Sequence, residues 1–139
     1  MRGAPLAVLQ RVPLFADLNP QELQEIALLF RESDFETGTK ILQEGSGGAA
    51  FYVIEAGEAT VAIRGTPHST LTAGDYFGEI ALLDEGPRMA TITAATRLDC
   101  WCLTSSDFRP LVEANGVIGW KLLQRMAMIL RDERGFRRG

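Results

Sequence analysis

A central stretch of short, glycine-separated segments limits the folds open to this chain. From Arg31 to Thr104, brief runs rich in β-branched and aromatic residues alternate with turns that contain glycine. One such run, AFYVIEAGEATVAIRG at 50–65, is predicted to form a hairpin that bends near Gly57. So many short strands favour an antiparallel β jelly-roll barrel over a parallel sheet.

Helical patterns flank this strand-rich stretch on both sides. Before it, Asn19 suits the cap of a helix and Pro20 its first position. With 139 residues the chain is long enough for one hydrophobic core and too short for two. The sequence therefore predicts a single, mainly β domain over 1–139 with flanking helices. Its parts are N-terminal helices over 1–30, the barrel over 31–104 and C-terminal helices over 105–139.

Composition excludes several classes of partner. The net charge of −4 argues against a nucleic-acid-binding surface, and no apolar run is long enough for membrane insertion. The N-terminus lacks the apolar core of a signal peptide, which favours a cytoplasmic protein. Cys100 and Cys102 share one face of a predicted strand and are expected to be buried thiols. With His68 as the single histidine, no metal site and no metal-dependent enzyme of the jelly-roll class is expected.

One segment, FGEIALLDEGPRMAT at 77–91, is not typical of a strand. A glycine at position 78 precedes a short helix whose first N–H groups are free to bind an anion such as phosphate. Arg88 adds a guanidinium that suits the same oxygens. Glu79 would be repelled by phosphate unless it pairs with an arginine or accepts a hydrogen bond from a neutral donor such as a sugar hydroxyl. A phosphorylated ribose offers both groups, so the residues indicate a nucleotide site.

The same segment resembles the phosphate-binding cassette of cyclic nucleotide-binding domains. This family includes the regulatory subunits of cAMP-dependent protein kinase, the bacterial catabolite activator protein and cyclic nucleotide-gated channels. The flanking segments FYVIEAGEATV and VPLFADLNPQELQEIA are also similar to the family, so the resemblance covers nearly the whole chain. Eight cassette positions agree in order and spacing, namely Phe77, Gly78, Glu79, Ile80, Ala81, Leu82, Arg88 and Ala90.

The resemblance implies roles for residues of the cassette. Glu79 would accept a hydrogen bond from the ribose 2′-hydroxyl, and Arg88 would pair with a phosphate oxygen. Gly78 would let the sugar approach closely. Backbone N–H groups of Ile80, Ala81 and Ala90 would complete the phosphate cradle. Thr91, the last residue of the segment, would also contribute to ligand binding.

Contacts to the base are also implied by the resemblance. The purine would lie against Val53 and Ala62 of the barrel. Met89 stands where a threonine in the family favours cGMP, and methionine cannot donate that bond, so cAMP is the expected ligand. Phe136, or an arginine near it, would cap the base if Gly135 breaks the last helix and the tail folds back.

The implied function is that of a non-enzymatic sensor. Binding of cAMP, or of cGMP in its place, would reposition the C-terminal helices and so act on an effector protein that the sequence does not identify. Two alternatives stay open: a nucleotide-free interaction or dimerisation scaffold, and the sensor part of a longer transcription regulator. The last helix carries an apolar stripe that suits either the core or a homodimer interface, formed by Trp120, Leu123, Ala127 and Leu130.

Overall fold

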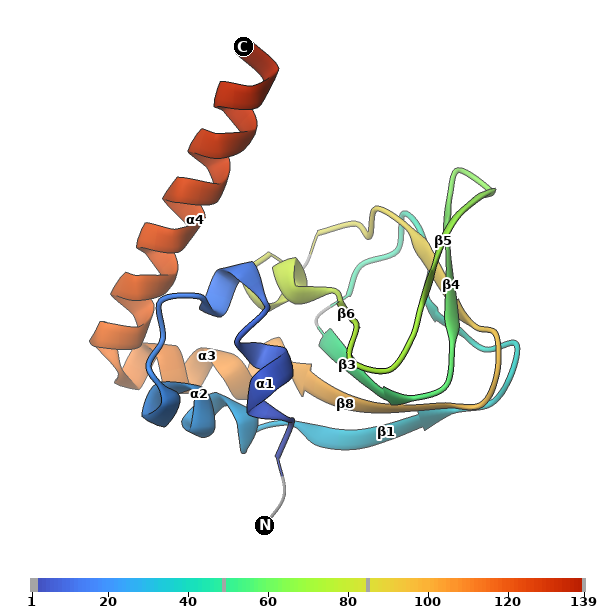
Figure 1. Ribbon diagram of the computed structural model, residues 1–139, viewed down its shortest axis with the longest axis horizontal. Helices are drawn as coiled ribbons and strands as arrows, with labels where there is room; N and C mark the ends of the chain where they lie inside the picture. The colour runs from blue at the N-terminus through green and yellow to red at the C-terminus, as the bar shows by residue number, and fades with distance from the viewer. Residues whose placement is uncertain (1–2, 49, 85, 139) are drawn as a thin grey trace.

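Two antiparallel sheets and two groups of helices make up the chain in the computed structural model (Figure 1). The structure describes residues 3–48, 50–84 and 86–138, with 133–138 described for their backbone alone. The strands are β1 (Arg31–Phe35), β2 (Lys40–Leu42), β3 (Ala50–Ala56), β4 (Ala59–Ile63), β5 (Thr66–Leu71), β6 (Tyr76–Phe77), β7 (Thr91–Ala94) and β8 (Leu98–Thr104). The helices are α1 (Leu6–Leu9), η1 (Pro13–Phe15), α2 (Pro20–Ala27), η2 (Glu79–Leu82), α3 (Ser105–Ala114) and α4 (Gly116–Arg138).

The two sheets have the strand orders β1-β8-β3-β6 and β2-β7-β4-β5. Buried residues from both sheets form one cluster, which places the sheets face to face as in a jelly roll, although they do not close into a barrel. Mainly β architecture with flanking helices is therefore confirmed. The expected closed barrel is not formed, because each sheet keeps its own edge strands.

The predicted hairpin at 50–65 is wrong, because β3 and β4 belong to different sheets. β3 pairs with β6 and β8, whereas β4 pairs with β5 and β7. Gly57, with φ at +101°, turns the chain from one sheet to the other. A Cβ at this position would lie 2.3 Å from the Arg97 carbonyl oxygen, so the corner also needs a residue without a side chain.

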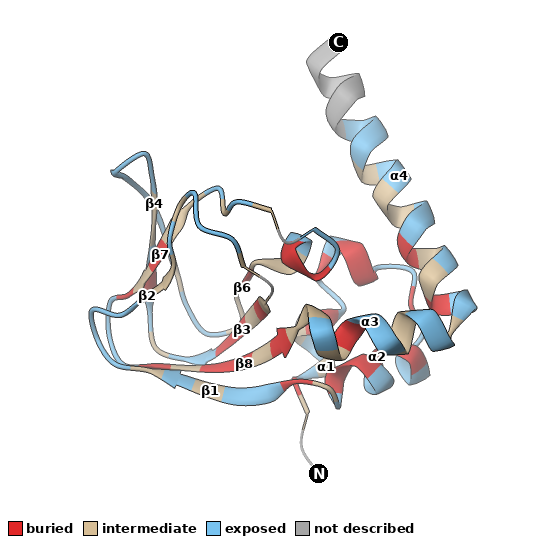
Figure 2. Ribbon diagram, turned by 180° about the vertical axis from the view of Figure 1, so that it is seen from behind, coloured by how far each residue is buried: buried red, intermediate tan, exposed pale blue. Residues whose placement is uncertain are grey.

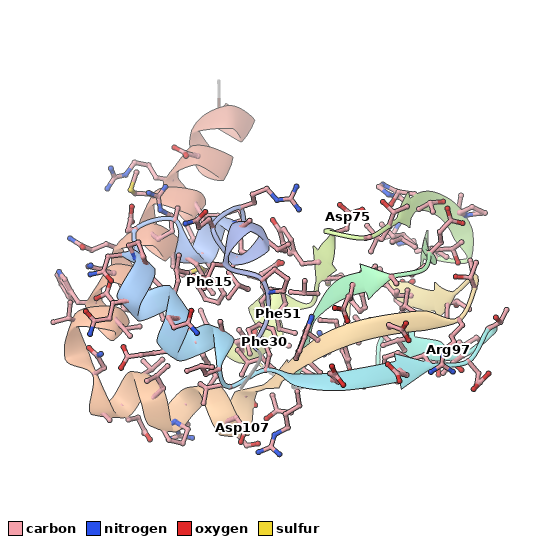
Figure 3. The ribbon with its side chains drawn as sticks, turned by 60° about the horizontal axis from the view of Figure 1, so that its bottom comes forward. Phe15, Phe30, Phe51, Asp75, Arg97 and Asp107 are labelled. Atoms are coloured by element: carbon pink, nitrogen blue, oxygen red, sulfur yellow. The ribbon has the colours of Figure 1, made fainter. Side chains whose placement is uncertain are left out.

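The N-terminal helices cover one face of the first sheet through an aromatic cluster. Asn19 accepts from the Glu22 N–H at 2.8 Å and Glu22 accepts from the Asn19 N–H at 2.9 Å, so the expected cap is a reciprocal capping box. Phe51 of β3 meets Phe15 and Phe30 edge-on, with ring centroids 6.1 and 5.6 Å apart (Figure 3). These three rings belong to a second and larger cluster of buried residues, which holds the helices on the sheet.

Helix α4 rises away from the sheets and ends far from them (Figure 1). Its first half is joined to the N-terminal helices by two ion pairs, Lys121 to Glu22 at 2.8 Å and Arg125 to Asp17, whose Nε–Oδ2 distance is 3.1 Å. The break at Gly135, which was the condition for a Phe136 cap, does not occur, since α4 continues to Arg138. In the described part of the chain, no helix is long and apolar enough to cross a bilayer.

Candidate functional site

A cleft of about 540 Å³ opens between η2, the loop that follows it and the second sheet. It brings together most of the segment that the sequence singled out, including the acid and the guanidinium. The lining residues are Leu42, Gly78, Glu79, Ile80, Ala81, Asp84, Gly86, Pro87, Arg88, Met89, Ala90 and Ile92.

The entrance to η2 depends on a glycine. Gly78 has φ at +85°, a left-handed conformation that other residues adopt at a cost. A Cβ there would lie 2.7 Å from the Ala50 carbonyl oxygen and 2.9 Å from Arg88 Nη1. The backbone of η2 can therefore lie directly against β3 and the guanidinium only with glycine at this position.

Arg88 is held by the loop between β2 and β3. Its Nη2 donates to the Ala50 carbonyl at 2.9 Å, and its backbone N–H donates to the Ser46 carbonyl at 2.8 Å. The Arg88 carbonyl in turn accepts from the Gly45 N–H at 2.9 Å. Gly48 lies against the same side chain, since a Cβ there would be 2.2 Å from Arg88 Nε. Two glycines and three hydrogen bonds thus fix where the guanidinium points.

The guanidinium of Arg88 keeps donor capacity for a ligand. Its Nε is buried and has no hydrogen-bond partner within the described residues. Burial lowers the pKa of Arg88, while the Tyr52 phenol nearby opposes this effect. A half-buried cation is stabilised by an anion, and a guanidinium is well suited to bind phosphate oxygens.

Glu79 is the first residue of η2 and lines the same cleft. Burial raises the pKa of its carboxyl above the ordinary value, with a hydrogen bond from its own backbone N–H acting in the opposite direction. A partly buried carboxylate is costly unless a donor meets it. Among the described residues, the cleft therefore places a guanidinium without an anionic partner near a carboxylate whose only donor is its own backbone N–H.

Two further features of the cleft were missed from the sequence. Asp84 accepts from the Gly86 N–H at 3.0 Å and so shapes the loop after η2. Leu42 and Ile92 supply an apolar wall from β2 and β7. The strand pattern showed that β2 and β7 exist, but it could not show that they lie beside the cassette.

Phe77 and Thr91 support the cleft without lining it, whereas Ala81 lines it. Phe77 stacks on Tyr52 between the sheets, with ring centroids 5.1 Å apart. Thr91 accepts from the Glu44 N–H at 3.0 Å. The Ala81 N–H, predicted to bind phosphate, already donates to the Gly78 carbonyl at 3.0 Å.

The predicted base contacts are where the structure departs most from expectation. Val53 is fully buried in the cluster beneath the helices, because it points to the opposite face of β3 from the cleft. Ala62 pairs with Thr91 and lines a separate shallow hollow on β4 and β5. Met89 lines the cleft with 83% of its surface exposed. The side chain of Phe136 lies outside those described.

Comparison with known proteins identifies the family. Residues 32–115 match the family described as Cyclic nucleotide-binding domain. The chain belongs to this family. Within the described residues, no group of three or more His, Cys, Asp or Glu side chains is placed to hold a metal ion.

Relatives of this cyclic nucleotide-binding domain include regulatory subunits of cAMP-dependent protein kinase. The chain is 42% identical over 106 residues to the cAMP-dependent protein kinase regulatory subunit of Yarrowia lipolytica, covering 75% of this chain and 28% of that protein. It thus spans under a third of this relative's length. The similarity is to the part of such subunits that this cyclic nucleotide-binding domain covers.

Two solved structures share its fold. The N-terminal domain of a transcriptional regulator from Streptomyces coelicolor A3(2) superposes with a TM-score of 0.81 at 29% identity, covering 91% of this chain and 94% of that one. The regulatory domain of Toxoplasma gondii PKA, crystallised with cAMP, gives a TM-score of 0.65 at 31% identity, covering 76% and 42%.

Proposed function

We propose that the cleft binds 3′,5′-cAMP and that this binding repositions α3 and α4. The observation that carries the proposal is that Arg88 and Glu79 line one cleft at the glycine-led start of η2. Arg88 meets the cyclic phosphate, and Glu79 accepts from the ribose 2′-hydroxyl. The guanidinium then gains an anion and the carboxylate gains a second donor, which favours a ligand that carries both groups.

The preference for cAMP over cGMP rests on Met89. Its side chain lies at the edge of the cleft and carries no hydrogen-bond donor for a guanine. An adenine needs only apolar contact at this point. The cocrystal of the related Toxoplasma gondii domain with cAMP supports the same choice.

The conformational step rests on the contacts of η2 with the C-terminal helices. Leu83 directly follows η2, has 47% of its surface exposed, and lines two hollows, one against α3 and one against α4. A ligand that draws η2 toward Arg88 changes how Leu83 packs on these helices. The equilibrium shifts only by the difference in affinity of cAMP for the two arrangements.

Parallel calorimetric titrations with cAMP and cGMP test the proposal. Tighter binding of cAMP is expected, together with altered hydrogen exchange in α3 and α4. If neither nucleotide binds, the domain is a nucleotide-free scaffold and the proposed function is wrong. Tighter binding of cGMP would contradict the role given to Met89 while keeping the site.

The downstream target has two candidates in the proposal. The kinase regulatory subunits suggest control of a protein kinase. The Streptomyces coelicolor regulator domain, which this chain matches over nearly its whole length, suggests control of transcription as the sensor part of a longer protein. Affinity capture with and without cAMP separates a kinase from a DNA-bound target.

A further inference from the structure

Met89 differs from the other methionines of the described chain in its exposure. It has 83% of its surface exposed, whereas Met128 on α4 has 44% exposed and Met126 is half-buried. Oxidation converts the apolar thioether of methionine into a polar sulfoxide, and the change is reversible in cells. A dissolved oxidant reaches the sulfur of Met89 without any opening of the fold. Among the described methionines, Met89 is therefore the most accessible to oxidation.

The backbone at Met89 is held against the cleft by its neighbours. Arg88 and Ala90, on either side of it, line the same cleft as Met89 itself. The Arg88 N–H donates to the Ser46 carbonyl at 2.8 Å, and the Arg88 carbonyl accepts from the Gly45 N–H at 2.9 Å. A chemical change in the Met89 side chain is therefore made at the edge of the candidate site.

The two cysteines are poor targets for the same oxidants. Both lie on β8, whose residues are buried or half-buried along the strand (Figure 2). Burial raises the pKa of the Cys100 thiol to about 12, and burial also raises the pKa of Cys102. Since the thiolate is the reactive form of cysteine, both side chains react slowly at neutral pH. A thioether needs no deprotonation, so Met89 is favoured over either thiol.

We propose that Met89 is a site of reversible oxidation by hydrogen peroxide, and that its sulfoxide weakens nucleotide binding in the cleft. In this reaction a lone pair of the thioether sulfur attacks one oxygen of the peroxide, and the O–O bond breaks. The hydroxide that leaves takes up the proton of the transferred oxygen and becomes water. The sulfur is oxidised by two electrons, and the peroxide is reduced by the same two. Methionine sulfoxide reductases reverse the change.

The effect on affinity rests on the proposed function, in which the base makes apolar contact with Met89. A sulfoxide is strongly hydrated, so a base that covers it displaces water that the thioether does not hold. We expect cAMP to bind about threefold to thirtyfold more weakly after oxidation, from the cost of desolvating one polar group at a partly wet site. Bound cAMP should in turn slow the oxidation, because the base covers the sulfur.

Peptide mass spectrometry of the nucleotide-free protein after peroxide treatment tests the modification itself. The added oxygen should appear at Met89 before it appears at Met126 or Met128. Saturating cAMP should slow the reaction of Met89 and leave that of Met128 unchanged. Oxidation of Met126 or Met128 before Met89, or at the same rate, would overturn the inference. The order of oxidation is measured without nucleotide, so it does not depend on the proposed function.

Calorimetric titration with cAMP before and after peroxide treatment tests the consequence. Met89→Leu has no sulfur at this position, and peroxide should leave its own affinity for cAMP where it was before treatment. Met128→Leu, which removes an exposed thioether outside the cleft, is the matched control and should lose affinity on treatment as the parent does. Unchanged affinity of the oxidised parent, or a loss of affinity in treated Met89→Leu, would overturn the inference.

Failure of the proposed function would look different. A parent that binds no nucleotide before treatment would overturn that function and, with it, the effect of oxidation on affinity. Preferential oxidation of Met89 would still be decided by the mass spectra.

Discussion

Lys121 Nζ lies 2.8 Å from Glu22 Oε1, which joins α4 to α2 across 99 residues of sequence. The same Glu22 oxygen accepts from the Asn19 N–H in the capping box. One carboxylate thus completes the capping box at the start of α2 and also holds α4 in place. Because the contact is partly buried, loss of this acid leaves both a backbone donor and a cation without a partner.

We expect Glu22→Gln to lower the free energy of unfolding by about 1 kcal/mol, because the amide keeps the hydrogen bond of the capping box but loses the ion pair with Lys121. The Lys121 ion pair and the Asn19 N–H lower the pKa of Glu22. Its contribution is therefore present above the unfolded pKa of about 4.3 and is lost as the pH falls through the lower folded value. Urea unfolding of parent and variant at pH 7 and pH 3 measures this. An equal difference at both pH values would contradict the ion pair.

Arg88→Leu should weaken cAMP binding by about 2–5 kcal/mol, because the phosphate would lose its charged partner in a partly buried cleft. Calorimetric titration measures the loss. Arg109→Leu removes an exposed arginine that is paired with Glu113 on the surface of α3, and it is the matched control. If both variants bind as tightly as the parent, Arg88 is not the phosphate ligand.

Glu79→Gln should stabilise the free domain and weaken nucleotide binding at neutral pH. Burial raises the pKa of Glu79, so its ionised form costs stability above the unfolded pKa of about 4.3, and this cost is avoided in the variant. The parent should lose cAMP affinity as the pH falls through the raised pKa, since the protonated acid is a poorer acceptor for the ribose hydroxyl.

Thermal melts without nucleotide and titrations from pH 7 to pH 5 measure these two effects of Glu79→Gln. A variant that keeps the parent's pH dependence would show that another group titrates.

Gly48→Ala should keep the fold but weaken cAMP binding at least tenfold, the loss expected when a charged contact is displaced. The new Cβ would lie 2.2 Å from Arg88 Nε, so the guanidinium must move. Gly86→Ala, whose Cβ would be 3.2 Å from Asp84 Oδ1, is a milder change in the same region. Thermal stability near that of the parent, with unchanged affinity, would show that Arg88 relocates without consequence.

Local patterns in the sequence were sufficient to predict the Asn19 helix cap and the glycine-led start of the short helix at Glu79. Asn19 and Pro20 lie at the start of α2, and Gly78 and Glu79 lie at the start of η2. Each pair therefore affects a helix that begins next to it in the sequence. The jelly-roll character also followed from the many short strands. These features depend on contacts near in sequence, which a single chain reveals directly.

Contacts between distant segments were harder to predict. The two arms around Gly57 look like a hairpin because both are strand-like, and the choice of sheet depends on partners elsewhere, such as β8 for β3 and β7 for β4. Val53 was predicted to contact the base, but it lies on the face of β3 that meets the helices, for a related reason. The alternation of β3 shows that it has two faces, both apolar here, but not which one meets the helices.

Phe77 and Leu82 lie at the two ends of the segment that opens the cleft, and each belongs to a different core cluster. Phe77 is held between the sheets, and Leu82 is held beneath the helices. Displacement of η2 must therefore disturb the packing of both clusters at once. Slow amide protons of the inter-sheet strands and of the helical cover should then respond in concert to nucleotide.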